Sequence, residues 1–145
     1  PNDAAHGPNG PRNVVYNCDV SSPKAGLWMG GMNENWLILH NRFVVERGQG
    51  VYAGTTSFDH IIQGNVFVLK DGKSPMLFLS RTNCVGVEVR DTRLYGGNGQ
   101  IASGPAQPLV LEGNQVFPLG DGPRPVPPVP SIYEWQKNQA RASGR

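Results

Sequence analysis

The chain has 145 residues, of which 17% are charged and 38% hydrophobic, and its formal net charge is +2. This length suits one domain with a substantial core. The weak net charge excludes the basic stripe of a nucleic-acid-binding protein, and no run of 18 apolar residues is present to span a membrane.

Residues 1–12 are predicted to be an irregular leader, because strand-forming residues begin only at about Asn13. From residue 13 to 120 a short pattern then recurs. It consists of an aliphatic residue, two further positions, a small polar residue and, two positions later, another apolar residue. The small polar positions are Cys18, Asn41, Asn65, Thr92 and Asn114, at intervals of 22 to 27 residues. Such a period predicts about five copies of one unit, stacked on each other.

Each repeat is expected to contain three short strands. The first follows a Gly or Pro, as at Gly26 and Gly50, the second ends at the small polar residue, and the third begins after it. Alternating apolar residues mark the strands, and no segment before residue 131 keeps the 3.6-residue period of a helix. The predicted fold class is therefore all-β, with the repeats wound as parallel coils.

Stacked coils would align the small polar residues into a ladder. Asn tolerates the left-handed backbone of a tight bend, and its amide can donate to one coil and accept from the next. The flanking apolar residues should form two internal columns, Val15, Ile38, Ile62, Val89, Leu111 and Val20, Phe43, Phe67, Leu94, Val116. Phe43 and Phe67 should stack directly. Cys18 and Cys84, about three coils apart, are predicted to be buried free thiols.

Residues 121–145 form a tail with a different composition. Residues 123–130 alternate Pro with Val and Arg, which predicts an extended polyproline-like segment, and Ser131 with Glu134 marks the start of a short helix. Two outward stripes of apolar residues need a cover: Val14, Leu37, Ile61, Val110 and Val44, Val68, Tyr95, Phe117. We expect residues 123–137 to fold back over one of these faces, or to pack on a neighbouring molecule.

The repeats over residues 13 to 118 resemble the right-handed parallel β-helix of the pectate-lyase-like superfamily, with Cys18 and Thr92 as departures in the ladder. The resemblance implies a carbohydrate-associated protein, polysaccharide lyase-like or glycoside hydrolase-like, at the cell surface or outside the cell. No capping helix precedes Asn13, and an uncovered coil leaves unpaired strand edges. We therefore expect this chain to be the C-terminal part of a longer protein, whose upstream coils would lie against its first coil.

In this superfamily the substrate groove runs along the outer face of the Gly-led sheet. Strand alternation places Leu27, Met29, Val51 and Ala53 inside and Trp28, Tyr52 and Leu77 outside. Trp28 and Tyr52 on consecutive coils predict a flat aromatic surface for stacking on a sugar ring. The alternative is that a protein partner or the tail covers these rings.

Catalytic groups are scarce, because no Asp, Glu, Lys, Arg or His falls within the strands of the Gly-led sheet. The nearest candidates lie in its bordering turns: Glu46, Arg47, Lys70 and Asp71. The resemblance implies a Lys or Arg base for a lyase, with calcium in the longer protein, whereas a glycosidase needs two carboxylates. The sequence shows no calcium-loop motif, so no metal or cofactor is expected in this chain, and we expect the chain alone not to be catalytic.

A second hypothesis needs no catalysis. The chain could be a structural or adhesive solenoid that binds a protein partner through its flat faces, or associates with itself. Sequence alone leaves both hypotheses open, because a fold does not determine a function.

Overall fold

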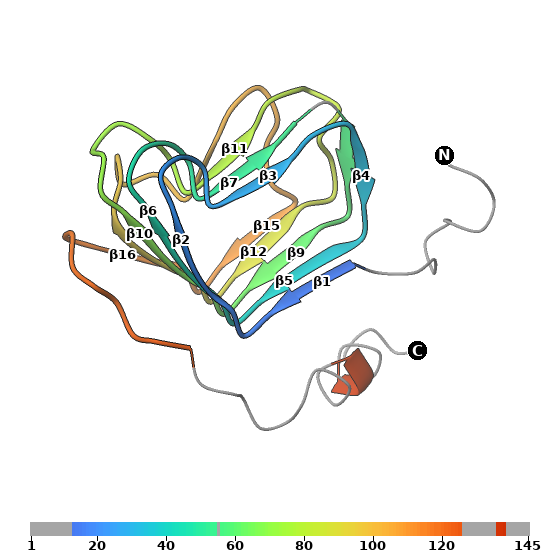
Figure 1. Cartoon of the computed structure of the whole chain (residues 1–145). Helices are drawn as coiled ribbons and strands as arrows, with labels where there is room; N and C mark the ends of the chain where they lie inside the picture. The colour runs from blue at the N-terminus through green and yellow to red at the C-terminus, as the bar shows by residue number, and fades with distance from the viewer. Residues whose placement is uncertain (1–12, 55, 126–135, 139–145) are drawn as a thin grey trace.

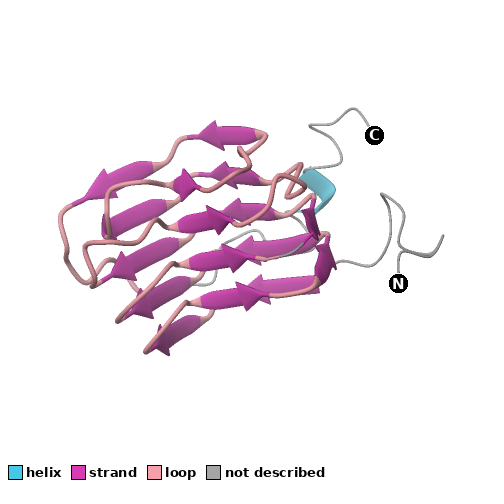
Figure 2. Ribbon diagram, turned by 90° about the horizontal axis from the view of Figure 1, so that it is seen from above, coloured by secondary structure: helices cyan, strands magenta, loops and turns pink. Residues whose placement is uncertain are grey.

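Each repeat of the sequence folds into one turn of a parallel β-solenoid, so the predicted all-β coil is confirmed (Figure 1). The computed structural model describes residues 13–54, 56–125 and 136–138. The chain makes about four turns, and neighbouring turns pair strand on strand (Figure 2). The predicted leader and the predicted helix start at Ser131 lie outside the described residues, and residues 136–138 form one helical turn.

Three parallel sheets form the walls of the solenoid. Sheet A contains β1 (Asn13–Tyr16), β5 (Trp36–Leu39), β9 (Ile61–Gln63), β12 (Glu88–Arg90) and β15 (Val110–Glu112). Sheet B contains β2 (Asp19–Ser22), β6 (Arg42–Val45), β10 (Val66–Leu69), β13 (Arg93–Gly96) and β16 (Gln115–Phe117). Sheet C contains β3 (Leu27–Met29), β7 (Val51–Ala53), β11 (Leu77–Leu79) and β14 (Ala102–Ser103).

The described chain enters on sheet A and leaves after sheet B, which is why sheet C has one strand fewer than the other two. A small fourth sheet, which the sequence did not predict, joins β4 (Met32–Glu34) to β8 (Thr56–Phe58) in the loops between sheets C and A. These loops are the longest part of the early turns, and the extra pairing satisfies backbone groups that would otherwise depend on water.

The bend between sheets A and B depends on one left-handed residue per turn. These residues are Asn17, His40, Gly64, Asp91 and Gly113, all with positive φ. Each precedes a ladder residue, so the expectation that the ladder Asn itself takes the left-handed conformation is wrong. The left-handed residue makes the corner, and the next side chain then points inward, where its amide meets the backbone of the preceding turn.

The ladder has a direction. The backbone N–H of Cys18 donates to Asn41 Oδ1 at 2.9 Å, and the N–H of Asn41 donates to Asn65 Oδ1 at 2.9 Å. The Asn41 amide then donates to the carbonyl of Val15 in the preceding turn at 2.9 Å. Asn65 and Asn114 repeat this donation toward earlier turns. Each ladder Asn therefore satisfies buried backbone groups of the turn before its own.

The internal columns form the core. Phe43 and Phe67 stack with ring centroids 4.9 Å apart and planes 9° from parallel, as predicted. In the last turn, however, Leu111 and Val116 are 51% and 48% exposed, because no described turn covers their column. Cys84 is buried, but the prediction for Cys18 is wrong: it is exposed, since it lies in the first described turn.

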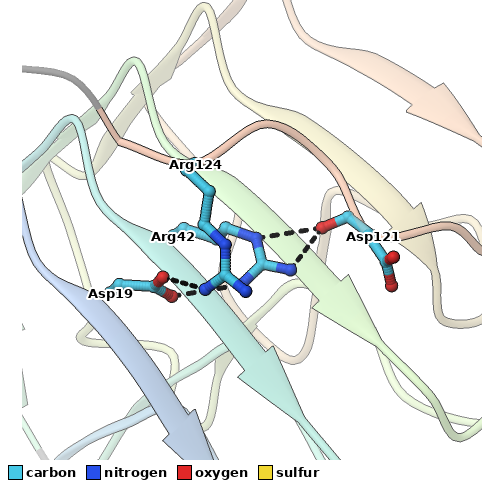
Figure 3. Close-up of polar contacts among 4 residues, drawn as sticks. All are labelled: Asp19, Arg42, Asp121 and Arg124. Atoms are coloured by element: carbon cyan, nitrogen blue, oxygen red, sulfur yellow. Dashed lines mark hydrogen bonds and ion pairs between the residues drawn. The ribbon is translucent and has the colours of Figure 1, made fainter.

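The segment after β16 covers the outer face of sheet B. Arg42 is only 5% exposed; its Nε and Nη2 donate to the carbonyl of Asp121 at 2.9 and 2.6 Å, and its Nη1 to Asp19 at 3.1 Å. Arg124 also pairs with Asp19 (Figure 3). These contacts, from Arg124 first and then Arg42, hold the pKa of Asp19 below its usual range.

The expectation that the outward apolar stripes are covered holds for Leu37 and Val68, which are 0% and 2% exposed, but not for Val14 in the first described turn, which is 42% exposed. On sheet B the cover includes Gly122, where an added Cβ would lie 2.6 Å from Val66 Cγ1 and 3.3 Å from the Tyr95 ring. The fold-back of the tail is thus observed for residues 121–125, and the rest of the predicted segment up to residue 135 lies outside the described residues.

We expect Arg42→Met to lower the free energy of unfolding by about 2 kcal/mol, because it removes charge-assisted bonds to Asp19 and to the Asp121 carbonyl while keeping the aliphatic stem. Arg93→Met is the matched control, since Arg93 occupies the same outward column and is exposed. Urea denaturation of both variants measures the difference. Equal stability of the two would show that the tail contact contributes nothing.

Candidate functional site

The candidate site is a column of aromatic rings on the outer face of sheet C. Trp28, Tyr52 and Phe78 are in register on β3, β7 and β11. Trp28 and Tyr52 stack with centroids 3.9 Å apart and planes 11° from parallel, and Tyr52 and Phe78 follow at 5.7 Å and 30°. We call these three residues the aromatic column.

The prediction that Leu77 joins this column is wrong. Leu77 pairs with Val51 and is fully buried, and Phe78 takes the outward place. The step from Leu27 to Val51 is 24 residues, but the step from Val51 to Leu77 is 26, because the turn after β10 is longer. Counting from the proline at residue 75 therefore misplaced the register, and the long interval between Asn65 and Thr92 was the signal of the longer turn.

The stacking changes the form of the predicted aromatic surface. The rings face each other along the solenoid axis, so the outer face of the sheet presents their edges. Tyr52 covers one face of the Trp28 indole, and Trp28 is still 64% exposed. Trp28 lies on β3, the edge strand of sheet C. The column therefore offers one open ring face, at its Trp28 end.

Glycines at the strand ends make room for these rings. A Cβ on Gly54 would lie 2.9 Å from Tyr52 Cε1, and a Cβ on Gly30 would lie 3.2 Å from Trp28 Nε1. The indole N–H edge therefore lies against backbone. Next to it, the Asn33 amide donates to the carbonyls of Gly30 and Gly31 and holds this turn in place.

The turn residues predicted as catalytic candidates lie apart from the aromatic column in pairings of their own. Lys70 forms an ion pair with Glu46 at 2.9 Å, and both side chains are about half exposed. Arg47 is exposed on the same turn. An exposed pair of this kind contributes little stability.

Asp71 organises its turn. Its carboxylate accepts from the N–H of Lys73 at 2.7 Å and from the N–H of Gly48 at 3.1 Å. These bonds, that from Lys73 first, hold the pKa of Asp71 below its usual range. A general acid in a glycosidase needs a raised pKa, so the environment of Asp71 favours the opposite protonation state.

His60 is fully buried, and burial lowers its pKa to about 4. Its Nδ1 accepts from the N–H of Trp36 in the preceding turn at 3.1 Å, so the neutral ring carries its proton on Nε2. Nε2 meets no hydrogen-bond partner among the described residues. The role of His60 is thus structural: its ring accepts a backbone hydrogen bond in the interior, where a ligand from solvent does not reach it.

Within the described part of the chain, no three His, Cys, Asp or Glu side chains come together to hold a metal ion. No helix in that part is long and apolar enough to span a membrane. Comparisons with protein-family models, with curated proteins and with solved structures find no significant match to this chain.

Proposed function

We propose that this chain is a carbohydrate-binding module without catalytic activity of its own, which contacts a sugar ring through the open face of Trp28. The observation that supports it is the geometry of the aromatic column: an indole 64% exposed, held flat by Tyr52 on its other face. A fixed, amphipathic ring face suits the apolar face of a pyranose and needs little ordering on binding.

The same proposal includes the finer fold family and location. Each turn adds one strand to each of the three parallel sheets that form the walls, and this arrangement, with its inward ladder of asparagines, supports a pectate-lyase-like solenoid, whose coil is right-handed. An extracellular or cell-surface location would bring the chain into contact with polysaccharide. The pairing of Glu46 with Lys70 and the bonds to Asp71 support a binding role over turnover.

Oligosaccharides, both neutral and uronate-containing, should quench tryptophan fluorescence of the chain, and Trp28→Ala should abolish the quench. One stacked ring contributes about 0.5–1.5 kcal/mol beyond area burial, so binding in the millimolar range is expected. Tyr52→Phe is the matched control, because it preserves the ring beneath Trp28. A quench that persists in Trp28→Ala would assign the signal to Trp36 or Trp135 and reject the site.

A further inference from the structure

Both ends of the solenoid present unpaired strand edges within the described chain. At the first turn these edges are β1, β2 and β3, and at the last turn they are β14, β15 and β16. Leu111 and Val116 point along the internal columns at the last turn and are about half exposed. Unpaired strand edges beside exposed apolar residues form a surface on which the strands of another turn can pair.

The register of the sheets shows that the first turn fits on the last. If the stack continued by one step, Val15 would lie on Leu111, Val20 on Val116, and Leu27 on Ala102. These three internal contacts would all join apolar residues. On the outer faces Tyr16 would meet Glu112 and Asp19 would meet Gln115, so no like charges would face each other.

The ladder also fits across this junction. Each ladder N–H donates to the side chain of the next rung, and the N–H of Asn114 has no next rung among the described residues. Cys18 matches Thr92: the Cys18 thiol donates to the carbonyl two residues earlier at 3.4 Å, as the Thr92 hydroxyl does at 3.0 Å. Thr92 Oγ1 accepts from the N–H of the preceding rung at 3.4 Å. The Cys18 sulfur could accept from Asn114 in the same way, more weakly.

We propose that the last turn of one chain docks on the first turn of a second copy. If two identical ends met, a two-fold axis would relate the copies and their strands would run antiparallel across the junction. This arrangement could align strands in only one of the three sheets. Joining opposite ends continues all three sheets by the step already present between turns. The contact is heterologous and does not close, so copies add in a row. This proposal goes beyond the sugar contact and does not depend on it. The junction would place Ser103 of the other copy next to Trp28, so a docked first turn could not also hold a sugar on the open ring face. The second copy takes the place expected above for upstream coils.

The test blocks each end separately. Val116→Lys should block the last turn and Val20→Lys the first, because each would bury an unpaired charge in the junction. In sedimentation velocity the wild type should grow in mass with concentration. Each variant alone should stay near 15.7 kDa, with self-association weakened at least about tenfold. An equimolar mixture should form a dimer, since each variant keeps one competent end.

Three results would overturn the proposal: a wild type that stays monomeric, a mixture that stays monomeric, or either variant dimerising alone, as pairing of identical ends requires. The unfolding midpoint of each variant checks that it folds.

A disulfide trap tests the same junction without a charge. Asn114→Cys should form an intermolecular disulfide with Cys18 of the second copy, because rungs on adjacent turns lie about 4.8 Å apart, within disulfide reach. Arg81→Cys, exposed on a loop, is the control and should not cross-link selectively. Cys18→Ser should abolish the product. Equal cross-linking of both cysteine variants would exclude the ladder register.

Discussion

Replacing Phe43 with alanine is expected to lower the free energy of unfolding by about 3–5 kcal/mol, the largest effect of any single substitution considered for this chain. Phe43 is 1% exposed and stacks on Phe67, which is fully buried. Backbone closes the space around both rings: a Cβ on Gly26 would lie 3.1 Å from Phe43, and a Cβ on Gly50 would lie 2.4 Å from Phe67.

The cavity left by Phe43→Ala could not collapse easily, because strand pairing on both sides fixes the spacing of the turns. Phe78→Ala is the matched control, since Phe78 is half-buried on the outer face of sheet C and stacks only at the end of the aromatic column. Chemical denaturation compares the two. If Phe43→Ala destabilised the chain no more than Phe78→Ala, the internal stack would not be a principal source of stability.

Lowering the pH from 7 to 4 is expected to cost about 3 kcal/mol of stability through His60. Its pKa is about 4 in the folded chain, against 6.5 when unfolded. Between these values the unfolded chain binds a proton that the folded chain excludes, so stability is complete above pH 6.5 and falls as the pH drops toward 4. The physical cause is the burial of a ring that already uses Nδ1 as an acceptor.

The measurement is the free energy of unfolding of wild type and His60→Asn at several pH values between 7 and 4. The Asn carbonyl can still accept from Trp36, but it does not titrate, so the variant should lose most of the slope. His40→Asn is the control, because His40 is less buried, its pKa is also lowered by burial, and Asn tolerates its left-handed conformation. An unchanged slope in His60→Asn would assign the pH dependence to other groups.

The period of the small polar residues was enough to predict the parallel coil, because one side chain per turn meets the same backbone groups in every turn. Asn41 and Asn65 show this most directly, because they lie 24 residues apart and are hydrogen-bonded to each other. The stack of Phe43 on Phe67 followed from the same count. These features depend on periodicity, which can be counted directly in the sequence.

The remaining features depend on loop lengths and on contacts distant in sequence. The turn after β10 is two residues longer than the turn after β6, so the residue equivalent to Gly50 is Met76 and not the preceding proline, and composition alone does not reveal this one-residue offset. The contact of Arg42 with Asp121 joins residues 79 positions apart. The faces of Trp28 and Tyr52 turn toward each other because adjacent turns lie close to the stacking distance of aromatic rings, which strand alternation cannot indicate.

The direction of the asparagine ladder bears on how such a chain could change in length. The amide of each ladder Asn donates to a backbone carbonyl of the preceding turn. Removing a whole turn therefore removes one donor and one acceptor together. Loss of part of a turn would instead separate the two and leave buried carbonyls unbonded. Duplication and deletion should therefore be tolerated in steps of one full repeat, so chains of this fold should differ in length by whole turns.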